Sequence, residues 1–179
     1  MPRLLLLRHA TPLTDGRLAG RRDVAADLSD RAALDRMRGR IGTVARIISS
    51  PARRCVMTAQ GLGLSPDALD ERLWEQDYGA WEGLPFADLP DLGRLPLSDL
   101  ARHRPDRGES FRDMAARVLP ALQALSQDTL IIAHAGTVRA ALSRVVGDAA
   151  LSFAVAPLSL TILQCHEDWS VEAVNITAT

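Results

Sequence analysis

The stretch Leu4-Leu5-Leu6-Leu7-Arg8-His9-Ala10 decides the fold, because a short apolar run ends abruptly on a cation and an imidazole. An unbroken apolar run of this length is typical of a strand buried on both faces by covering helices. Two later stretches have the same character. The sequence therefore predicts buried strands over residues 3–7, 45–49 and 129–133.

Longer stretches of helical period alternate with these runs, which favours an α/β fold with helices covering a mostly parallel sheet. Helices are predicted over residues 30–40, 52–62, 109–125 and 137–146. Residues that favour the N-cap position stand near three of the starts, namely Ser29 or Asp30, Ser50, and Ser110.

Two segments depart from this alternation. Residues 84–108 contain Pro85, Pro90, Pro96 and Pro105 without a sustained period, so we expect a small cap excursion over the active face. The C-terminal segments 158–165 and 170–177 predict a hairpin that turns at Glu167-Asp168, close to His166. No linker or repeat interrupts the chain, so residues 1–179 are interpreted as one domain.

Composition limits the classes of protein to consider. The 179 residues are 47% hydrophobic and 24% charged, which suits a globular domain with a sizeable core. Basic and acidic residues number 21 and 22, so no overall field attracts nucleic acid or an anionic membrane. Every basic residue is arginine, which excludes lysine Schiff-base chemistry and a P-loop lysine.

The cysteines and the N-terminus point to the cytoplasm. Cys55 and Cys165 are too few and too far apart for a disulfide framework or a zinc site, and both are expected to be buried thiols. The apolar run at the N-terminus is only four leucines long before Arg8 interrupts it. We therefore expect neither a signal peptide nor a membrane span.

Two of the four histidines follow predicted strands directly. His9 comes after the first strand, and His134 follows the apolar stretch 130–133. Ligands of open α/β sheets bind beyond the carboxyl ends of the strands, so both imidazoles are candidates for one site. A single histidine at a strand end is more often structural, and the matched pair is what favours function.

A third strand end introduces arginines. The stretch Ser50-Pro51-Ala52-Arg53-Arg54 places proline and two cations in the first turn of a predicted helix. A helix N-terminus favours anions, so cations there are mismatched unless a negative group binds between them. A phosphate satisfies this arrangement, although the alternative of solvated side chains stays open for either arginine.

These residues belong to a set of signatures that resembles the histidine phosphatase superfamily, also called phosphoglycerate mutase-like. The signatures keep the order and spacing of that family from residue 4 to residue 139. They are Leu7-Arg8-His9-Ala10, then Ser50-Pro51 with Arg54 and Thr58-Ala59, then Leu73, Glu75, Tyr78-Gly79 and Trp81-Glu82-Gly83, then Gly108-Glu109-Ser110, and finally His134-Ala135-Gly136 with Arg139.

The resemblance implies a three-layer α/β/α sandwich and a phosphohistidine intermediate on His9. It also implies phosphate contacts from Arg8, Arg54 and His134, and a proton donor at Glu75. The loop after His9 departs from the family pattern, with Pro12 and Asp15 where many members have a hydroxyl residue and an asparagine. We therefore expect either that Thr11 and Thr14 supply the outer phosphate contacts or that this loop is arranged differently.

The residue types suit phosphoryl transfer without a metal or other cofactor. Arginine and histidine donors stabilise the charge on the equatorial oxygens, and neutral imidazole attacks without a separate base. A leaving alkoxide needs a proton, and Glu75 beside Trp74 is the candidate donor, with Glu71 and Glu82 as rivals. Glu82 is expected to brace its loop instead, as is Glu109.

The substrate is expected to be a small phosphorylated molecule. The resemblance covers general phosphatases and the α-ribazole phosphatases of cobalamin assembly, and the stretch Gly20-Arg21-Arg22-Asp23 leans toward the latter. Alternatives are a phosphoglycerate mutase, disfavoured by the chain's compactness, and a non-catalytic relative that binds phosphorylated ligands.

His103 is expected either to contact the non-phosphate part of the substrate or to be solvated. The oligomeric state stays open, with a homodimer through the C-terminal hairpin as one option.

Overall fold

The computed structural model describes residues 2–165 and 167–178, and within them six strands form one sheet. The strand order is β3-β2-β4-β1-β5-β6. Four strands are parallel, namely β3 (Ala68–Leu69), β2 (Arg46–Ser49), β4 (Thr129–Ala133) and β1 (Arg3–Arg8). The C-terminal hairpin of β5 (Leu160–Gln164) and β6 (Ser170–Ile176) adds two antiparallel strands beside β1. The predicted hairpin and mostly parallel sheet are confirmed, while His166 lies outside the described residues.

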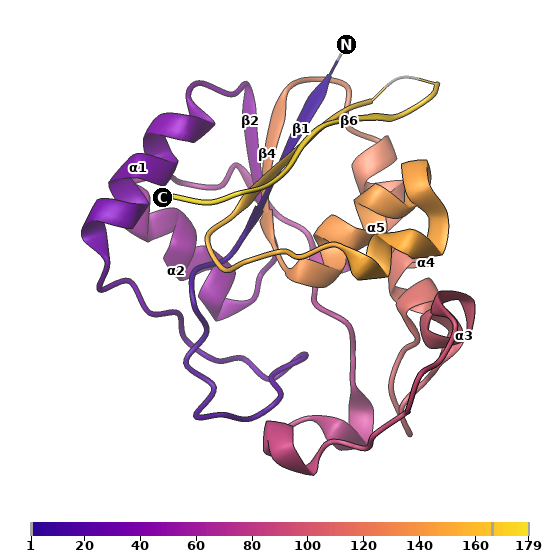
Figure 1. Cartoon of the computed structure of the whole chain (residues 1–179). Coiled ribbons are helices and arrows are strands. Elements are labelled where there is room, and N and C mark those ends of the chain that lie inside the picture. The colour runs from indigo at the N-terminus through magenta and orange to yellow at the C-terminus, as the bar shows by residue number, and fades with distance from the viewer. Residues whose placement is uncertain (1, 166, 179) are drawn as a thin grey trace.

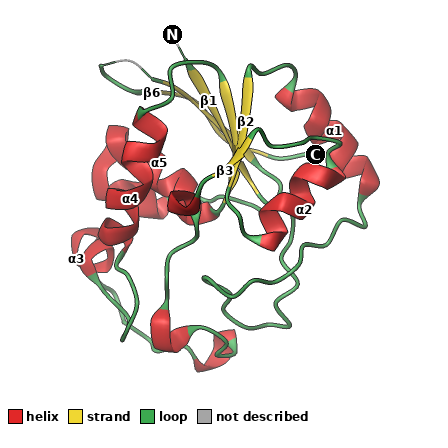
Figure 2. Cartoon of the chain, turned by 180° about the vertical axis from the view of Figure 1, so that it is seen from behind, coloured by secondary structure: helices red, strands yellow, loops and turns green. Residues whose placement is uncertain are grey.

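Helices cover both faces of this sheet, which gives the three-layer α/β/α arrangement (Figure 1). On one face lie α1 (Arg31–Ile41) and α2 (Arg53–Gly61), and on the other α4 (Phe111–Gln123) and α5 (Ala135–Val146) (Figure 2). Leu5 and Leu7 belong to the core cluster on the α1 and α2 side, whereas Leu4 and Leu6 belong to the opposite one. The unbroken leucine run is thus explained by burial of both faces of β1.

The helix starts refine the predicted caps. Asp30 caps α1 by accepting a hydrogen bond from the Ala33 amide at 2.9 Å. Ser110 caps α4 in a reciprocal capping box with Asp113. Ser50 is not the N-cap of α2, because Ala52 holds that position, and the Ser50 hydroxyl lies 3.0 Å from a nitrogen of His134 instead.

The excursion 84–108 contains a short helix that the sequence pattern did not predict. This helix, α3 (Leu97–Arg102), begins directly after Pro96 and is six residues long. Six residues are too few for a helical period to be recognised. The excursion and the loop 10–30 lie beyond the carboxyl ends of β1, β2 and β4, where they surround the edge that carries the candidate residues (Figure 1).

The cysteines and the helix lengths can also be compared with the sequence-based expectations. Cys55 and Cys165 are buried and free, as predicted. None of the described helices has the length and apolar character needed to cross a membrane.

Candidate functional site

The register of two neighbouring strands brings His9 and His134 together. β1 and β4 pair in parallel with Arg8 opposite Ala133, so each next residue is a histidine at the same sheet edge. The His9 amide continues the ladder by donating to the Ala133 carbonyl at 3.0 Å. The ring centroids lie 5.2 Å apart with an edge-on geometry. Two segments 125 residues apart therefore meet at one point, as the strand pattern predicts.

Arg54 lies between the two rings and is only 2% exposed. Its Nε donates to Nε2 of His9 at 3.3 Å, and its Nη2 donates to Nδ1 of His134 at 3.2 Å. The carbonyls of Gly20 and Arg22 accept from the same guanidinium at 2.7 and 2.9 Å. The loop before α1 thus holds this side chain in place. Arg53, by contrast, is exposed and does not line the cavity described below.

His9 is a neutral imidazole with its Nε2 unprotonated. Its Nδ1 lies 2.7 Å from the Ala10 carbonyl and must donate there, which leaves Nε2 to accept from Arg54. Burial lowers the pKa of His9 to about 3, and the positive charge of Arg54 adds to this effect. A neutral ring is the form that attacks an electrophile, once the Arg54 N–H turns away from Nε2 and frees its lone pair.

His134 is also neutral, but it is fully buried and does not line the cavity. Burial, followed by the charge of Arg54, lowers the pKa of His134 well below its ordinary value. Nε2 donates to the Ser50 hydroxyl at 3.0 Å, while Nδ1 accepts from Arg54. The Trp74 ring stacks on the imidazole at 6.3 Å. His134 therefore contacts the guanidinium of Arg54 and is not at the cavity surface, whereas the family resemblance implies a direct phosphate contact.

A cavity of about 430 Å³ opens in front of these groups. Its charged lining residues are Arg8, Arg54, Glu75 and Arg139, and the neutral His9 ring lines it as well. Arg8 donates from Nη1 to the Val155 carbonyl, and its Nε is buried without a partner in the described part of the chain. Burial lowers the pKa of Arg8, although the nearby Glu75 charge opposes the shift. The charged residues that line the cavity thus carry an excess of positive charge.

Glu75 reaches this cavity at the N-terminus of α5. Its Oε2 accepts from the Gly136 amide at 3.4 Å, and its Oε1 accepts from the Gln76 amide at 3.0 Å. Its two rivals lie elsewhere and do not line the cavity. Glu71 accepts from the indole N–H of Trp74 at 2.9 Å, and Glu82 accepts from the Tyr78 amide at 3.1 Å, so each braces its own loop.

The loop after His9 contributes polar and apolar lining. Thr11, Pro12 and Thr14 line the cavity, so the expected hydroxyl groups are present there. Asp15 has a φ of 53° and does not line it. The repulsive carboxylate that the sequence introduces is therefore outside the cavity.

Sequence reasoning gave no role to three further lining residues. Arg139 and Tyr78 stand within the family signatures, so their motif positions were an available signal. Burial raises the pKa of Tyr78, so its phenol stays protonated. Phe86 lines the mouth and is 55% exposed, and it belongs to the excursion whose path the pattern did not reveal.

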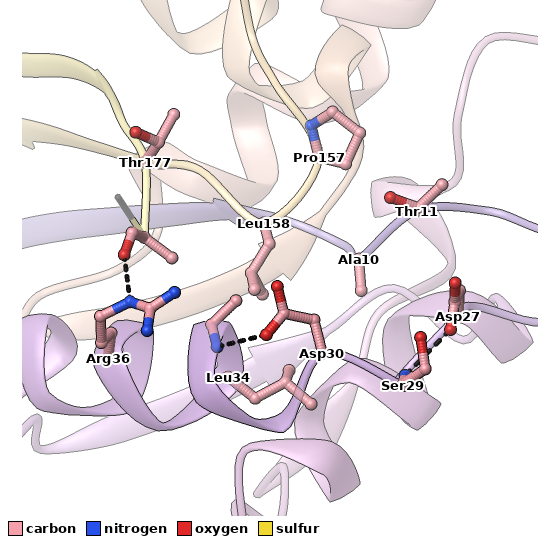
Figure 3. A pocket seen from close by; sticks show the side chains of 12 residues that line it. Ala10, Thr11, Asp27, Ser29, Asp30, Leu34, Arg36, Pro157, Leu158 and Thr177 are labelled. Carbon is pink, nitrogen blue, oxygen red and sulfur yellow. Dashed lines mark hydrogen bonds between the residues drawn. The ribbon is translucent and has the colours of Figure 1, made fainter.

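Figure 3 shows a second cavity, of about 260 Å³, beside the start of the loop that follows His9. Ala10 and Thr11 line it together with Asp27, Asp30 and Arg36. The Nε of Arg36 donates to the Ala178 carbonyl at 2.6 Å. An anion there would meet two carboxylates and one arginine that is already engaged, so the cavity in front of His9 is the better phosphate site.

The arrangement matches a known family. Residues 4–177 match the model of the histidine phosphatase superfamily, branch 1. The chain belongs to this superfamily. It is 33% identical over 171 residues to a glucosyl-3-phosphoglycerate phosphatase of Mycolicibacterium vanbaalenii, covering 81% of this chain and 74% of that one. The solved structure of a mycobacterial glucosyl-3-phosphoglycerate phosphatase superposes with a TM-score of 0.82 at 25% identity, over 99% of this chain and 100% of the other.

Other relatives differ in size. A bifunctional protein of Mycobacterium tuberculosis is 35% identical over 147 residues, which cover 75% of this chain. The match spans only 38% of the length of that protein. A 2,3-bisphosphoglycerate-dependent phosphoglycerate mutase of Methylobacterium radiotolerans is 34% identical over 105 residues, about half of each chain.

Proposed function

We propose that this chain hydrolyses small-molecule phosphomonoesters through a phosphohistidine on Nε2 of His9. The observation that carries the proposal is the neutral His9 ring, whose unprotonated Nε2 faces Arg54 beside a cavity lined by further arginines. Arg54 is buried, and its hydrogen-bond partners in the described part of the chain are neutral. A phosphoryl group in the cavity supplies the negative charge that balances it.

The reaction has two steps. In the first, the lone pair of Nε2 forms a bond to phosphorus while the ester P–O bond breaks, and Glu75 in its protonated form gives the leaving alkoxide its proton. In the second, water attacks the phosphoramidate, the P–N bond breaks, and Glu75 takes the proton from that water. The products are the free alcohol and inorganic phosphate. Arg8 and Arg54 stabilise the charge on the transferring group.

This chemistry needs no metal ion. In the described part of the chain, no group of three or more His, Cys, Asp or Glu side chains is placed to hold one. The donors for the phosphoryl oxygens are guanidinium groups instead.

Two substrates are candidates, one from the family resemblance and one from the name of a relative. The family resemblance favours α-ribazole phosphate, and the Mycolicibacterium relative is named for glucosyl-3-phosphoglycerate. A mutase reaction and phospholigand binding without turnover are the competing readings.

The test is a panel of phosphomonoesters assayed in the presence of a chelator. The panel contains p-nitrophenyl phosphate, α-ribazole phosphate, glucosyl-3-phosphoglycerate and 3-phosphoglycerate, the last with a trace of the bisphosphate. We expect release of inorganic phosphate and, after rapid quenching, an acid-labile, alkali-stable phosphoprotein that His9→Asn lacks. Arg53→Ala, which changes an exposed residue outside the cavity, is the control for effects of substitution and purification alone. Isomerisation of 3-phosphoglycerate would favour the mutase, and the absence of turnover on every ester would favour the binding protein.

A further inference from the structure

A smaller cavity of about 210 Å³ adjoins the cavity in front of His9. The two cavities share Tyr78 and Arg139, which line both. The rest of the smaller cavity is mainly apolar, and we call it the apolar annex. Its apolar walls include Trp81, Leu92, Leu100, Phe111 and Leu151. A ligand anchored by its phosphate near Arg8 and His9 therefore has an apolar space beside it.

The annex walls come from separate segments that are fastened together. The Ala80 amide donates to the Asp106 carbonyl at 2.9 Å, which ties the turn before Trp81 to the end of the excursion. Gly79 makes this approach possible, because a Cβ there would lie 2.1 Å from the Asp106 carbonyl oxygen. Trp81 also stacks on His103 at 5.2 Å. The walls are therefore held in place by their own contacts, which lowers the entropy cost of binding.

Four lining residues of the annex carry polar side chains, namely Gln76, Tyr78, His103 and Arg139. In three of them a nitrogen is already engaged or enclosed by the walls, and Arg139 is one of these, since its Nε donates to the Phe153 carbonyl at 3.2 Å. The Gln76 amide nitrogen already donates to the Glu109 carbonyl at 2.7 Å. Nε2 of His103 is buried, with no hydrogen-bond partner in the described part of the chain. A sugar placed here would lose water without gaining an equal number of hydrogen bonds, at a cost of about 1–3 kcal/mol for each unpaired group.

We propose that the annex binds an aromatic ring carried by the alcohol of the phosphomonoester. This rests on the proposed function, since the phosphate of the same molecule lies at His9. The volume of about 210 Å³ exceeds the roughly 150 Å³ of an engineered apolar cavity that holds benzene. Burial of a ring against Trp81 and the leucines gains hydrophobic free energy, which a hydroxyl-rich alcohol does not provide.

The direct test compares esters with similar leaving groups and different side groups. The probes are ethyl phosphate, glycerol 3-phosphate and 3-phenylpropyl phosphate. We expect kcat/KM for the phenylpropyl ester to exceed that for the other two by at least about tenfold. Equal values for the three esters would overturn the inference while leaving the proposed phosphatase activity in place.

A matched pair of variants locates the effect. Leu92→Trp fills the annex, whereas Leu95→Trp adds the same bulk three residues away, at a residue that is 39% exposed and does not line the annex. We expect Leu92→Trp to remove the phenylpropyl preference without changing kcat/KM for ethyl phosphate, and Leu95→Trp to keep both. Leu100→Trp, at another residue of the annex wall, is the second variant should Leu92→Trp fail to fold.

A binding measurement keeps the two proposals separate. 4-Phenylbutylphosphonate and butylphosphonate cannot be hydrolysed, so calorimetry measures their affinity whether or not the chain turns over esters. We expect tighter binding of the phenyl compound by at least about tenfold, and loss of that difference in Leu92→Trp. Hydrolysis that fails while this difference persists would overturn only the proposed function. Equal affinities would overturn the annex inference.

Discussion

Nε of Arg54 donates a hydrogen bond to Nε2 of His9 across 3.3 Å. The cation therefore contacts the atom that we propose as the nucleophile, and it adds to burial in lowering the pKa of His9. Its other partners are a second neutral imidazole and two carbonyls, and none is a carboxylate. A buried cation with neutral partners is costly, and the phosphoryl group is the counter-ion that this arrangement favours. A bound phosphoryl group has to take over the Arg54 N–H, which frees the lone pair of Nε2. The guanidinium can thus orient the ring before binding and stabilise the transferring group afterwards.

Replacement of Arg54 tests this double role. We expect Arg54→Ala to lower kcat/KM by about 10²–10³-fold, because a charge-stabilising donor is lost from the transferring group. Arg54→Lys should recover little of this activity, since a single ammonium cannot donate to both rings and both carbonyls at once. The measurement is steady-state kinetics with p-nitrophenyl phosphate.

Arg53→Ala is the matched control for that experiment. Arg53 is the neighbouring residue on α2, but it is exposed and outside the cavity. Its variant should keep kcat/KM within about threefold of the parent chain, as is usual for surface substitutions. Equal losses in the two variants would show that the charge of the helix start matters and the contacts of Arg54 do not.

The protonation state of His9 gives a prediction that does not depend on catalysis. Nitrogen-detected NMR should show a ring protonated at Nδ1 that does not titrate between pH 8 and about 4.5, since burial and Arg54 lower its pKa to about 3. The assignment comes from loss of the signal in His9→Asn. An inflection near pH 6.5 for this ring would contradict the assigned neutral state.

Unfolding at two pH values checks the same shift by linkage. The pKa of His9 is about 3 in the folded chain against 6.5 in the unfolded one, so between these values only the unfolded state binds the proton. The free energy of unfolding should therefore fall as the pH is lowered from 6.5 toward 3, and His9 should contribute about 2 kcal/mol of that fall by pH 5. Urea titrations at pH 7 and pH 5 should show a smaller fall in His9→Asn. His134, shifted in the same direction, accounts for part of what remains.

Sequence reasoning anticipated the parts of this site that follow from strand ends. His9 and His134 follow directly from buried strands, and a parallel register is enough to bring them together. It did not anticipate that His134 would be fully buried behind Arg54, because strand pattern fixes the edge of the sheet and says nothing of depth. The role of the Gly20 carbonyl as a partner of Arg54 also depends on a long-range loop contact that no local pattern encodes.

The sequence pattern also did not predict which residues of the excursion 84–108 line the two cavities. Phe86 and Leu92 lie in a proline-rich stretch without a period, so neither helix nor strand geometry could orient their side chains. The short helix α3 is six residues long and has only Ala101 fully buried, so it left no apolar stripe to detect. The backbone conformation of such segments is determined by tertiary contacts and not by a local sequence pattern.

Glu75→Gln tests the proton donor. An amide cannot give a proton to the leaving alkoxide, so kcat/KM for alkyl phosphates should fall by about 10²–10⁴-fold. p-Nitrophenyl phosphate should lose much less, because its leaving group departs without protonation. Glu71→Gln is the matched control, since Glu71 is exposed, is bonded to the indole of Trp74, and does not line the cavity. Equal losses for both classes of ester in Glu75→Gln would assign this residue a structural role.

The position of Glu75 depends on the missing side chain of Gly136. A Cβ at Gly136 would lie 2.1 Å from Oε1 of Glu75 and 2.8 Å from Sδ of Met114, so Gly136→Ala must displace the carboxylate or the helix start. We expect this variant to lower kcat by about 10²-fold for alkyl phosphates, with a smaller change for p-nitrophenyl phosphate, because the proton donor is misplaced by about an ångström while the phosphate contacts remain.

Gly39→Ala is the control for the added methyl group. Gly39 lies within α1, and apart from its chain neighbours and the backbone of its own helix no atom lies within 4 Å of the site of a Cβ. Alanine there should raise the free energy of unfolding by about 0.5–1 kcal/mol and leave kcat unchanged. If Gly136→Ala lost p-nitrophenyl phosphate and alkyl phosphate turnover equally, the damage would lie in the phosphate contacts. A selective loss on alkyl esters, together with the same selectivity in Glu75→Gln, would show that the close approach at Gly136 positions the proton donor.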